Sequence, residues 1–282
     1  MSGDGTGAEP VEPATLADKV KRELKEWGQT LAVFVPAFFA FSLVLFEQRV
    51  IPSESMVPNL QVSDRVAVSK YAYGYGKYSV PWGVHRILPL GEGRLFAKTP
   101  EHGDVAVFMH PHWKRVMIKR VIGLPGDRVQ MRDERLYLNG EPVETDFVRR
   151  VRYITHAEQK PVTAVETRET IGENSWLSHQ WPDRTSLDNT PEFIVPEGHI
   201  FFVGDNRDNS KDARDTSGHC RAEGGVVDEA GCDPRVPAQE ASVGFVPMDH
   251  LIGRAETVIF SFYRCRASDE ADCPGPRLWK GL

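Results

Sequence analysis

Residues 116–127 of the chain read VMIKRVIGLPGD, and this stretch determines the class of fold that the sequence can adopt. Its first part, 116–122, is a compact and mostly apolar run, which the Leu-Pro-Gly-Asp turn at 124–127 ends. Alternation along a strand places Met117, Lys119 and Val121 on one face, so the Lys119 ammonium would have apolar neighbours. The stretch therefore predicts a strand that bears a desolvated lysine, whose pKa would be lowered toward that of a usable general base.

On either side of this strand, the sequence after residue 50 is also strand-like. The Asn-Gly pair at 139–140 predicts a two-residue hairpin turn between 136–138 and 141–143. No stretch in this part has helical periodicity over 12 residues. Residues 144–191 are polar and turn-rich, which is typical of an inserted subdomain, and residues 215–242 are typical of a surface excursion. Further short strands are predicted at 65–69, 104–109, 193–195 and 199–203. We therefore expect a mostly β fold.

The composition is that of a globular chain. Hydrophobic residues make up 40% and charged residues 26% of the 282 positions, which excludes a mainly disordered chain. The net charge is −6, so the chain lacks the basic footprint of a nucleic-acid-binding protein.

A long apolar segment precedes the β-rich part. Residues 27–46 read WGQTLAVFVPAFFAFSLVLF and contain no charge over 20 positions. A helix of this length would extend about 30 Å, the thickness of a bilayer's hydrocarbon core. A buried core helix would alternate with polar residues, and a cleaved signal peptide would be followed by small residues rather than by Glu47, Gln48 and Arg49. We expect a retained transmembrane helix at 27–46.

The distribution of basic residues around this segment predicts its orientation. Lysine and arginine are denser before the segment than after it, which favours a cytoplasmic segment at 1–26 and an extracytoplasmic domain at 47–282. The four cysteines would then lie where disulfides persist. Four cysteines allow three connectivities, and short loop closure favours Cys220–Cys232 with Cys265–Cys273.

Three polar features could provide chemistry. Ser53 and Ser55 lie in a loop between two prolines, just beyond the apolar segment, and Lys119 could act as their base because none of the nine histidines sits in a recognisable protease pattern. The third feature is the polar loop at 204–214, GDNRDNSKDAR. It does not fit a calcium loop, because Ala213 stands where the sharp turn needs glycine. A zinc site at His219, Cys220 and Cys232 is an open alternative with an unfamiliar spacing.

Taken together, these segments resemble the bacterial type I signal peptidases, membrane-bound serine proteases that remove signal peptides from exported proteins. The resemblance extends over about residues 47–255, with the matching blocks in the family's order. The blocks are 52–58 (PSESMVP), 64–73 (DRVAVSKYAY), 103–108 (GDVAVF), 118–127 (IKRVIGLPGD), 204–214 and 244–247 (GFVP).

The resemblance implies twisted, largely antiparallel sheets that form a catalytic subdomain with an inserted one at about 128–199. It implies a Ser/Lys dyad in which Ser55 is the nucleophile and Lys119 the general base, with no metal or organic cofactor. The oxyanion would be bound by the Ser55 backbone N–H and the Ser53 hydroxyl. Supporting roles fall to Ser210, which would orient the lysine, and to an ion pair of Asp212 with Arg214. Shallow apolar depressions for the substrate would be lined by Ile51, Pro52, Met56, Leu60 and Ile118.

The implied partners are the signal peptides of translocated preproteins, membrane lipid and, by proximity, the secretion translocon. The implied location is the bacterial inner membrane, with the catalytic domain in the periplasm. The chain departs from the family pattern at Asn59, where many members have threonine, and in the length of the 215–242 excursion. Two rival functions remain open. One is a self-processing Ser/Lys protease of the repressor type, which would not need the apolar segment. The other is a membrane-tethered binding domain that has lost catalysis.

Overall fold

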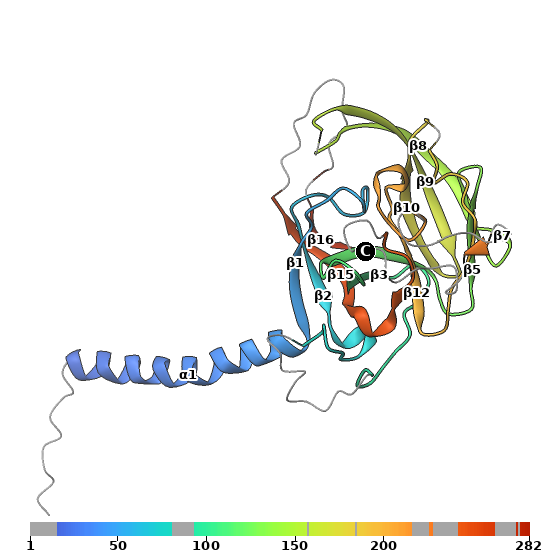
Figure 1. Cartoon of the computed structure of the whole chain (residues 1–282). Helices are drawn as coiled ribbons and strands as arrows, with labels where there is room; N and C mark the ends of the chain where they lie inside the picture. The colour runs from blue at the N-terminus through green and yellow to red at the C-terminus, as the bar shows by residue number, and fades with distance from the viewer. Residues whose placement is uncertain are drawn as a thin grey trace, which may run out of the picture. The chain divides into compact units, whose positions relative to one another are not determined.

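The computed structural model describes residues 16–80, 93–156, 158–183, 185–215, 226–227, 242–262, 275 and 277–282. The chain divides into two compact units, residues 1–43 and 44–282. The first unit contains most of α1 (Leu16–Val44), the one long helix in the described ranges (Figure 1). Pro36 lies within this helix. The second unit contains the strands.

The helix differs from the one expected at 27–46. It begins earlier, at Leu16, and ends at Val44, because Phe46 is already the first residue of strand β1 (Phe46–Val50) and pairs with Ser69 of β2 (Asp64–Ser69). In the described part of the chain, no helix combines the length and the apolar character needed to cross a membrane.

The largest sheet of the described residues has eight strands. Their order is β1-β2-β15-β3-β4-β12-β14, with β16 paired to β15, and every neighbouring pair is antiparallel. The further strands of this sheet are β3 (Val105–Met109), β4 (Val116–Gly123), β12 (His199–Val203), β14 (Val246–Pro247), β15 (Leu251–Ser261) and β16 (Leu278–Gly281). Among the described residues, the connections contain three short 3-10 helices, Tyr71–Tyr73, Arg207–Asn209 and Met248–His250.

The strands of two smaller sheets, all but one short strand, lie between β4 and β12 in the chain. Because β4 and β12 are hydrogen-bonded neighbours, residues 124–198 are an insertion between two adjacent strands. One smaller sheet has the order β10-β9-β8 and the other the order β13-β11-β5-β6-β7. Their strands are β5 (Arg128–Arg132), β6 (Arg135–Leu138), β7 (Glu141–Pro142), β8 (Glu144–Ile154), β9 (Pro161–Ile171), β10 (Asn174–Gln180), β11 (Glu192–Ile194) and β13 (Val226–Val227).

The mostly β, largely antiparallel fold is confirmed. Strands form at 64–69, 105–109, 116–123 and 199–203, each within a residue of its predicted bounds, and the hairpin turn has positive φ at both Asn139 and Gly140, as the Asn-Gly pair predicts. The polar stretch 144–191 contains the long strands β8, β9 and β10, which the sequence pattern did not reveal.

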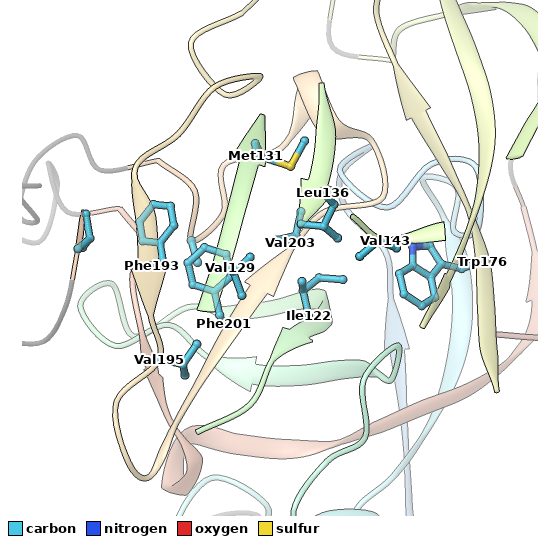
Figure 2. Close-up of a cluster of buried hydrophobic side chains, with 12 residues drawn as sticks. Ile122, Val129, Met131, Leu136, Val143, Trp176, Phe193, Val195, Phe201 and Val203 are labelled. Carbon is cyan, nitrogen blue, oxygen red and sulfur yellow. The ribbon is translucent and has the colours of Figure 1, made fainter. Parts of the chain in front are cut away.

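A buried cluster joins the insertion to the large sheet. Ile122 of β4 and Phe201 of β12 pack with Val129 and Phe193 of the insertion, and Trp176 of β10 joins the same cluster (Figure 2). The large sheet and the insertion therefore share one core, so the insertion is held in place beside the strands that bear the site described below. All four cysteines and most of the 215–242 excursion lie outside the described residues, and so do His219, Cys220 and Cys232 of the zinc alternative.

Candidate active site

The loop between β1 and β2 presents the two serines singled out in the sequence. Backbone hydrogen bonds close its base, from the Ile51 N–H to the Asp64 carbonyl (2.9 Å) and from the Ser63 N–H to the Ile51 carbonyl (2.8 Å). The buried Asp64 carboxylate accepts the Arg277 guanidinium at 2.9 and 3.1 Å, and the same guanidinium also donates to the Asn59 carbonyl. The loop is thus anchored at its base by a buried ion pair and is not free to drift.

In this loop, the Ser55 side chain contacts the side chain of Lys119. Lys119 lies in the middle of β4 opposite Ala106 of β3, and its Nζ donates a hydrogen bond to the Ser55 Oγ. Both side chains are almost fully buried, with 3% of Lys119 and 6% of Ser55 exposed. Within the described ranges, no histidine hydrogen-bonds to Ser55. The nucleophile candidate therefore faces an amine and not an imidazole.

Burial makes this lysine unusually acidic. Desolvation lowers the pKa of Lys119 from 10.5 to about 8, although the nearby carboxylates of Asp212 and Asp205 act in the opposite direction. A neutral amine is therefore accessible near physiological pH, and only the neutral amine can accept the Ser55 proton. The neutral fraction of Lys119 grows as the pH rises through about 8, so the amine can act as a base for Ser55.

Ser53 lies beside the dyad on the exposed side of the loop. Its Oγ is 3.4 Å from the Ser55 Oγ, and both residues line a cavity of about 330 Å³. This position is compatible with the hydroxyl donor expected there from the sequence. Ser210 is also brought close: a Cβ built on Gly204 would lie 2.1 Å from the Ser210 Oγ and 2.6 Å from the Ser55 carbonyl oxygen. The Ser210 Oγ is buried and makes no hydrogen bond to Lys119. The Ser210 hydroxyl instead helps to lower the pKa of the Asp212 carboxyl.

Asp212 and Arg214 form a buried ion pair. The Arg214 Nε and Nη2 donate to the two Asp212 carboxylate oxygens, both at 2.9 Å, and neither side chain is more than 2% exposed. The guanidinium holds the pKa of Asp212 below its usual value against the opposing effect of burial. The Asp212 carboxylate also accepts the Gly204 N–H at 2.9 Å, so this pair fixes the backbone that touches Ser55.

Two further groups of polar contacts around the loop were missed in the sequence. The buried Glu54 carboxylate accepts the His156 N–H at 2.7 Å, at the far end of β8, while Asn206 donates from its backbone to the Ser55 carbonyl and from its side chain to the Glu54 carbonyl, both at 3.1 Å. Glu54 thereby joins the insertion to the nucleophile loop. Its position between the two serines is the one signal that could have identified it.

The second group is centred on Asp205. Its carboxylate accepts two hydrogen bonds of 2.7 Å from the Arg120 guanidinium and one of 2.8 Å from Asn59. Arg120 is adjacent to Lys119 on β4, so alternation sends the two basic side chains in opposite directions. Asn59, the residue that departs from the family pattern, is therefore used to hold the polar loop against the nucleophile loop.

The cavity beside Ser55 receives only part of the expected apolar lining. Ile51, Pro52 and Ile118 line it, together with Val107 and Val116. Met56 and Leu60 do not line it, because both are completely buried and pack in the core with Ile51 and Ile118. Met56 and Leu60 pack behind the residues that line the cavity and are not part of its surface. In the described ranges, no group of three or more His, Cys, Asp or Glu side chains is placed to hold a metal ion.

The proteins that are similar to this chain belong to one family. Residues 24–260 match the family model described as signal peptidase, peptidase S26. The chain is 31% identical to the signal peptidase I of Rickettsia massiliae (strain Mtu5) over 88% of its own length and 83% of that protein, and 31% identical to that of Rickettsia bellii (strain OSU 85-389) over 89% and 78%. A crystal structure of a signal peptidase I from Enterococcus faecalis V583 aligns with 56% of the chain and 97% of its own, at 24% identity and a TM-score of 0.29. The family match spans most of the chain and both residues of the buried Ser55–Lys119 pair, and the chain therefore belongs to the signal peptidase family, peptidase S26.

Proposed function

We propose that this chain is a serine endopeptidase that removes N-terminal signal peptides from exported preproteins. The observation that supports this most directly is the hydrogen bond between the Lys119 Nζ and the Ser55 Oγ, buried at the edge of an open cavity. A lysine whose pKa is lowered to about 8 is a base matched to an alcohol nucleophile near neutral pH.

The chemistry follows from this pair. The neutral Lys119 amine accepts the Ser55 proton as the Oγ attacks the scissile carbonyl, and the tetrahedral oxyanion is bound by the Ser55 N–H and the Ser53 hydroxyl. Collapse of the tetrahedral intermediate breaks the peptide bond, Lys119 gives its proton to the leaving amine, and an acyl-enzyme on Ser55 remains. Water activated by Lys119 then releases the acyl group, which restores the enzyme.

Three residues of the polar loop have supporting roles in this proposal. Asp212 and Arg214 hold the backbone at Gly204, which in turn limits the position of Ser55. Ser210 lies on the same side of Gly204 as the Ser55 carbonyl, and we assign it the orientation of Lys119 that the resemblance implies. None of the three contacts the reacting carbonyl, so they act by positioning.

The apolar part of the cavity suits small substrate side chains. An extended peptide presents alternate side chains to one surface, so positions −1 and −3 would face Ile51, Pro52 and Ile118. A leucine there would be overpacked at about 1–3 kcal/mol, which corresponds to a loss of about 5- to 150-fold in rate. Alanine at −1 and −3 fits without that penalty.

The location of the substrate sets the location of the enzyme. We place residues 47–282 on the extracytoplasmic side of the bacterial plasma membrane, next to the translocon from which preproteins emerge. The exposed apolar side chains of α1, among them Leu31, Phe34 and Phe38, would hold the chain at the membrane lipid. The basic residues that precede residue 27 favour a cytoplasmic N-terminus.

The test is cleavage of a preprotein by the full chain purified in detergent. Wild-type enzyme should release the mature protein at a fixed bond, and Ser55→Ala and Lys119→Ala should each remove almost all turnover, because a nucleophile and its base act as a unit. Retained cleavage in Lys119→Ala would refute the dyad. Cleavage only of the enzyme's own chain would favour the self-processing rival, and binding without cleavage would favour the tethered binding domain.

A further inference from the structure

The cavity beside Ser55 has an uneven distribution of charge. Besides Lys119 it is lined by three basic residues, Arg49, Arg115 and Lys211, and no aspartate or glutamate is among its lining residues. The whole chain has a net charge of −6, so the positive charge of these three residues, here called the rim cations, is opposite in sign to that of the protein as a whole. A positive site on an acidic protein is a local feature that needs its own explanation.

The three rim cations differ in whether a nearby carboxylate neutralises their charge. Arg49 pairs with Glu47 of the same strand, so its charge is largely offset. The side chains of Arg115 and Lys211 are both exposed, and neither side chain forms an ion pair or a hydrogen bond with any described residue. These two side chains are therefore free to bind an anionic group that enters the cavity.

Their places in the chain set how far they lie from the reacting atoms. Arg115 precedes β4 and is four residues before Lys119, a separation of about 13 Å at the usual rise of a strand. Lys211 directly follows Ser210, which packs against Gly204 near the Ser55 carbonyl. An extended substrate has the same rise per residue, so a side chain up to about four positions from the scissile bond is within reach of these cations.

We propose that Arg115 and Lys211 form a subsite for an aspartate or glutamate side chain of the substrate, close to but distinct from positions −1 and −3. The inference rests on the proposed function, because it takes the cavity to be the site where the peptide lies. An anionic lipid headgroup has related chemistry. The peptide is favoured because the same cavity contains Ser55 and Lys119, and a headgroup bound there would compete with the substrate.

Exposed charge pairs of this kind contribute modestly, and their effect falls as salt rises. A glutamate at the right position should raise kcat/KM about three- to five-fold over glutamine at low salt. Lysine at that position should lower kcat/KM by a similar factor. Both effects should diminish at 1 M salt, where the screening length is only about 3 Å.

The experiment compares preproteins that carry Glu, Gln or Lys singly at each position from −6 to +5, with −1 and −3 kept as alanine. They are cleaved by the detergent-purified full chain, by Arg115→Gln, Lys211→Gln and the double variant, and by Lys114→Gln. Lys114 is the matched control, since it is an exposed cation next to Arg115 that does not line the cavity. The expected result is a Glu/Gln ratio of about three to five at one position or two, which falls to about one in the double variant and persists in Lys114→Gln.

Three results would overturn the inference alone, while cleavage of the glutamine preprotein keeps the proposed function intact. They are equal rates for Glu, Gln and Lys at every position, a Glu/Gln ratio that survives in the double variant, and a charge effect seen only with vesicles of anionic lipid and not of zwitterionic lipid. Failure of the wild-type enzyme to cleave any preprotein would overturn the proposed function and this inference with it.

Discussion

Replacement of Gly204 by alanine tests whether the polar loop sets the position of the nucleophile. A Cβ at this residue would lie 2.6 Å from the Ser55 carbonyl oxygen, about 0.8 Å short of the 3.4 Å at which ordinary van der Waals contact begins. Gly204 cannot easily retreat, because its N–H donates to Asp212 at 2.9 Å and its carbonyl accepts from Arg207 at 3.2 Å. The Ser210 side chain, whose Oγ would lie 2.1 Å from the same Cβ, and the Ser55 backbone must therefore both move, and we expect Ser55 to move by most of that distance of about 0.8 Å.

The expected loss can be worked out from this displacement. A misplacement of about 1 Å in a catalytic group lowers the rate by about 100-fold. We therefore expect Gly204→Ala to lower kcat by about 50- to 100-fold and to lower the free energy of unfolding by about 1–3 kcal/mol from overpacking. KM should change less, because Ile51 and Ile118 of the cavity do not touch Gly204.

The assay is steady-state cleavage of a preprotein, with circular dichroism and thermal unfolding of the same samples. Gly281→Ala is the control, because a Cβ there meets nothing within 4 Å and its backbone does not need glycine. A Gly204→Ala enzyme that is folded and has the kcat of the wild type would refute the claim that this contact positions Ser55.

Three further outcomes are expected. Because the reactive form of Lys119 is the neutral amine, kcat/KM should rise with pH and level off above about 8, and a pH–rate profile whose limb lies near 6.5 would instead indicate a histidine. Lys119→Met should be inactive, yet its free energy of unfolding in urea at pH 7 should be about 3 kcal/mol higher than that of the wild type. The reason is that the pKa of Lys119 is about 8 in the folded state and 10.5 in the unfolded state, so the charged lysine destabilises the fold below pH 8. The difference in stability should disappear as pH rises from 8 to 10.5. Glu54→Ala removes the acceptor of the His156 N–H, so it should lower the free energy of unfolding by about 1.5–3 kcal/mol and lower kcat, and an unchanged melting temperature would contradict the role given to this contact.

Strands that bury one or both faces could be predicted from the sequence. β2 alternates buried and partly buried residues over most of its length, and β3 is buried at four of its five positions, so their apolar patterns are visible in the chain. β8 could not be predicted in this way. Its residues are mostly exposed on both faces, so neither apolar alternation nor a continuous apolar run marks it. The same polar character made 144–191 resemble loops.

The site was only partly predictable for a different reason. Ser55 and Lys119 could be named through the resemblance to a family, and the geometry brings them together. The Arg120–Asp205 pair joins residues 85 positions apart, and the Glu54–His156 contact joins residues 102 apart. Contacts between residues so far apart in the chain depend on the tertiary arrangement of the strands and the insertion, which a local sequence pattern does not predict. Met56 and Leu60 lie in the core and not among the residues that line the cavity, because an apolar residue near a nucleophile can pack either into a pocket or into the core behind it.

The contact between Asn206 and Ser55 has a consequence for the synthesis of the enzyme. The nucleophile is made early in the chain, and the backbone that holds it follows about 150 residues later. A partly synthesised or partly exported chain therefore contains both dyad residues before it contains Gly204, Asn206 and Asp212. We expect such a chain to lack the contacts that hold Ser55 in place, so proteolytic activity should begin only once the polar loop has formed them. The order of synthesis would in this way keep the protease inert until the chain is nearly complete.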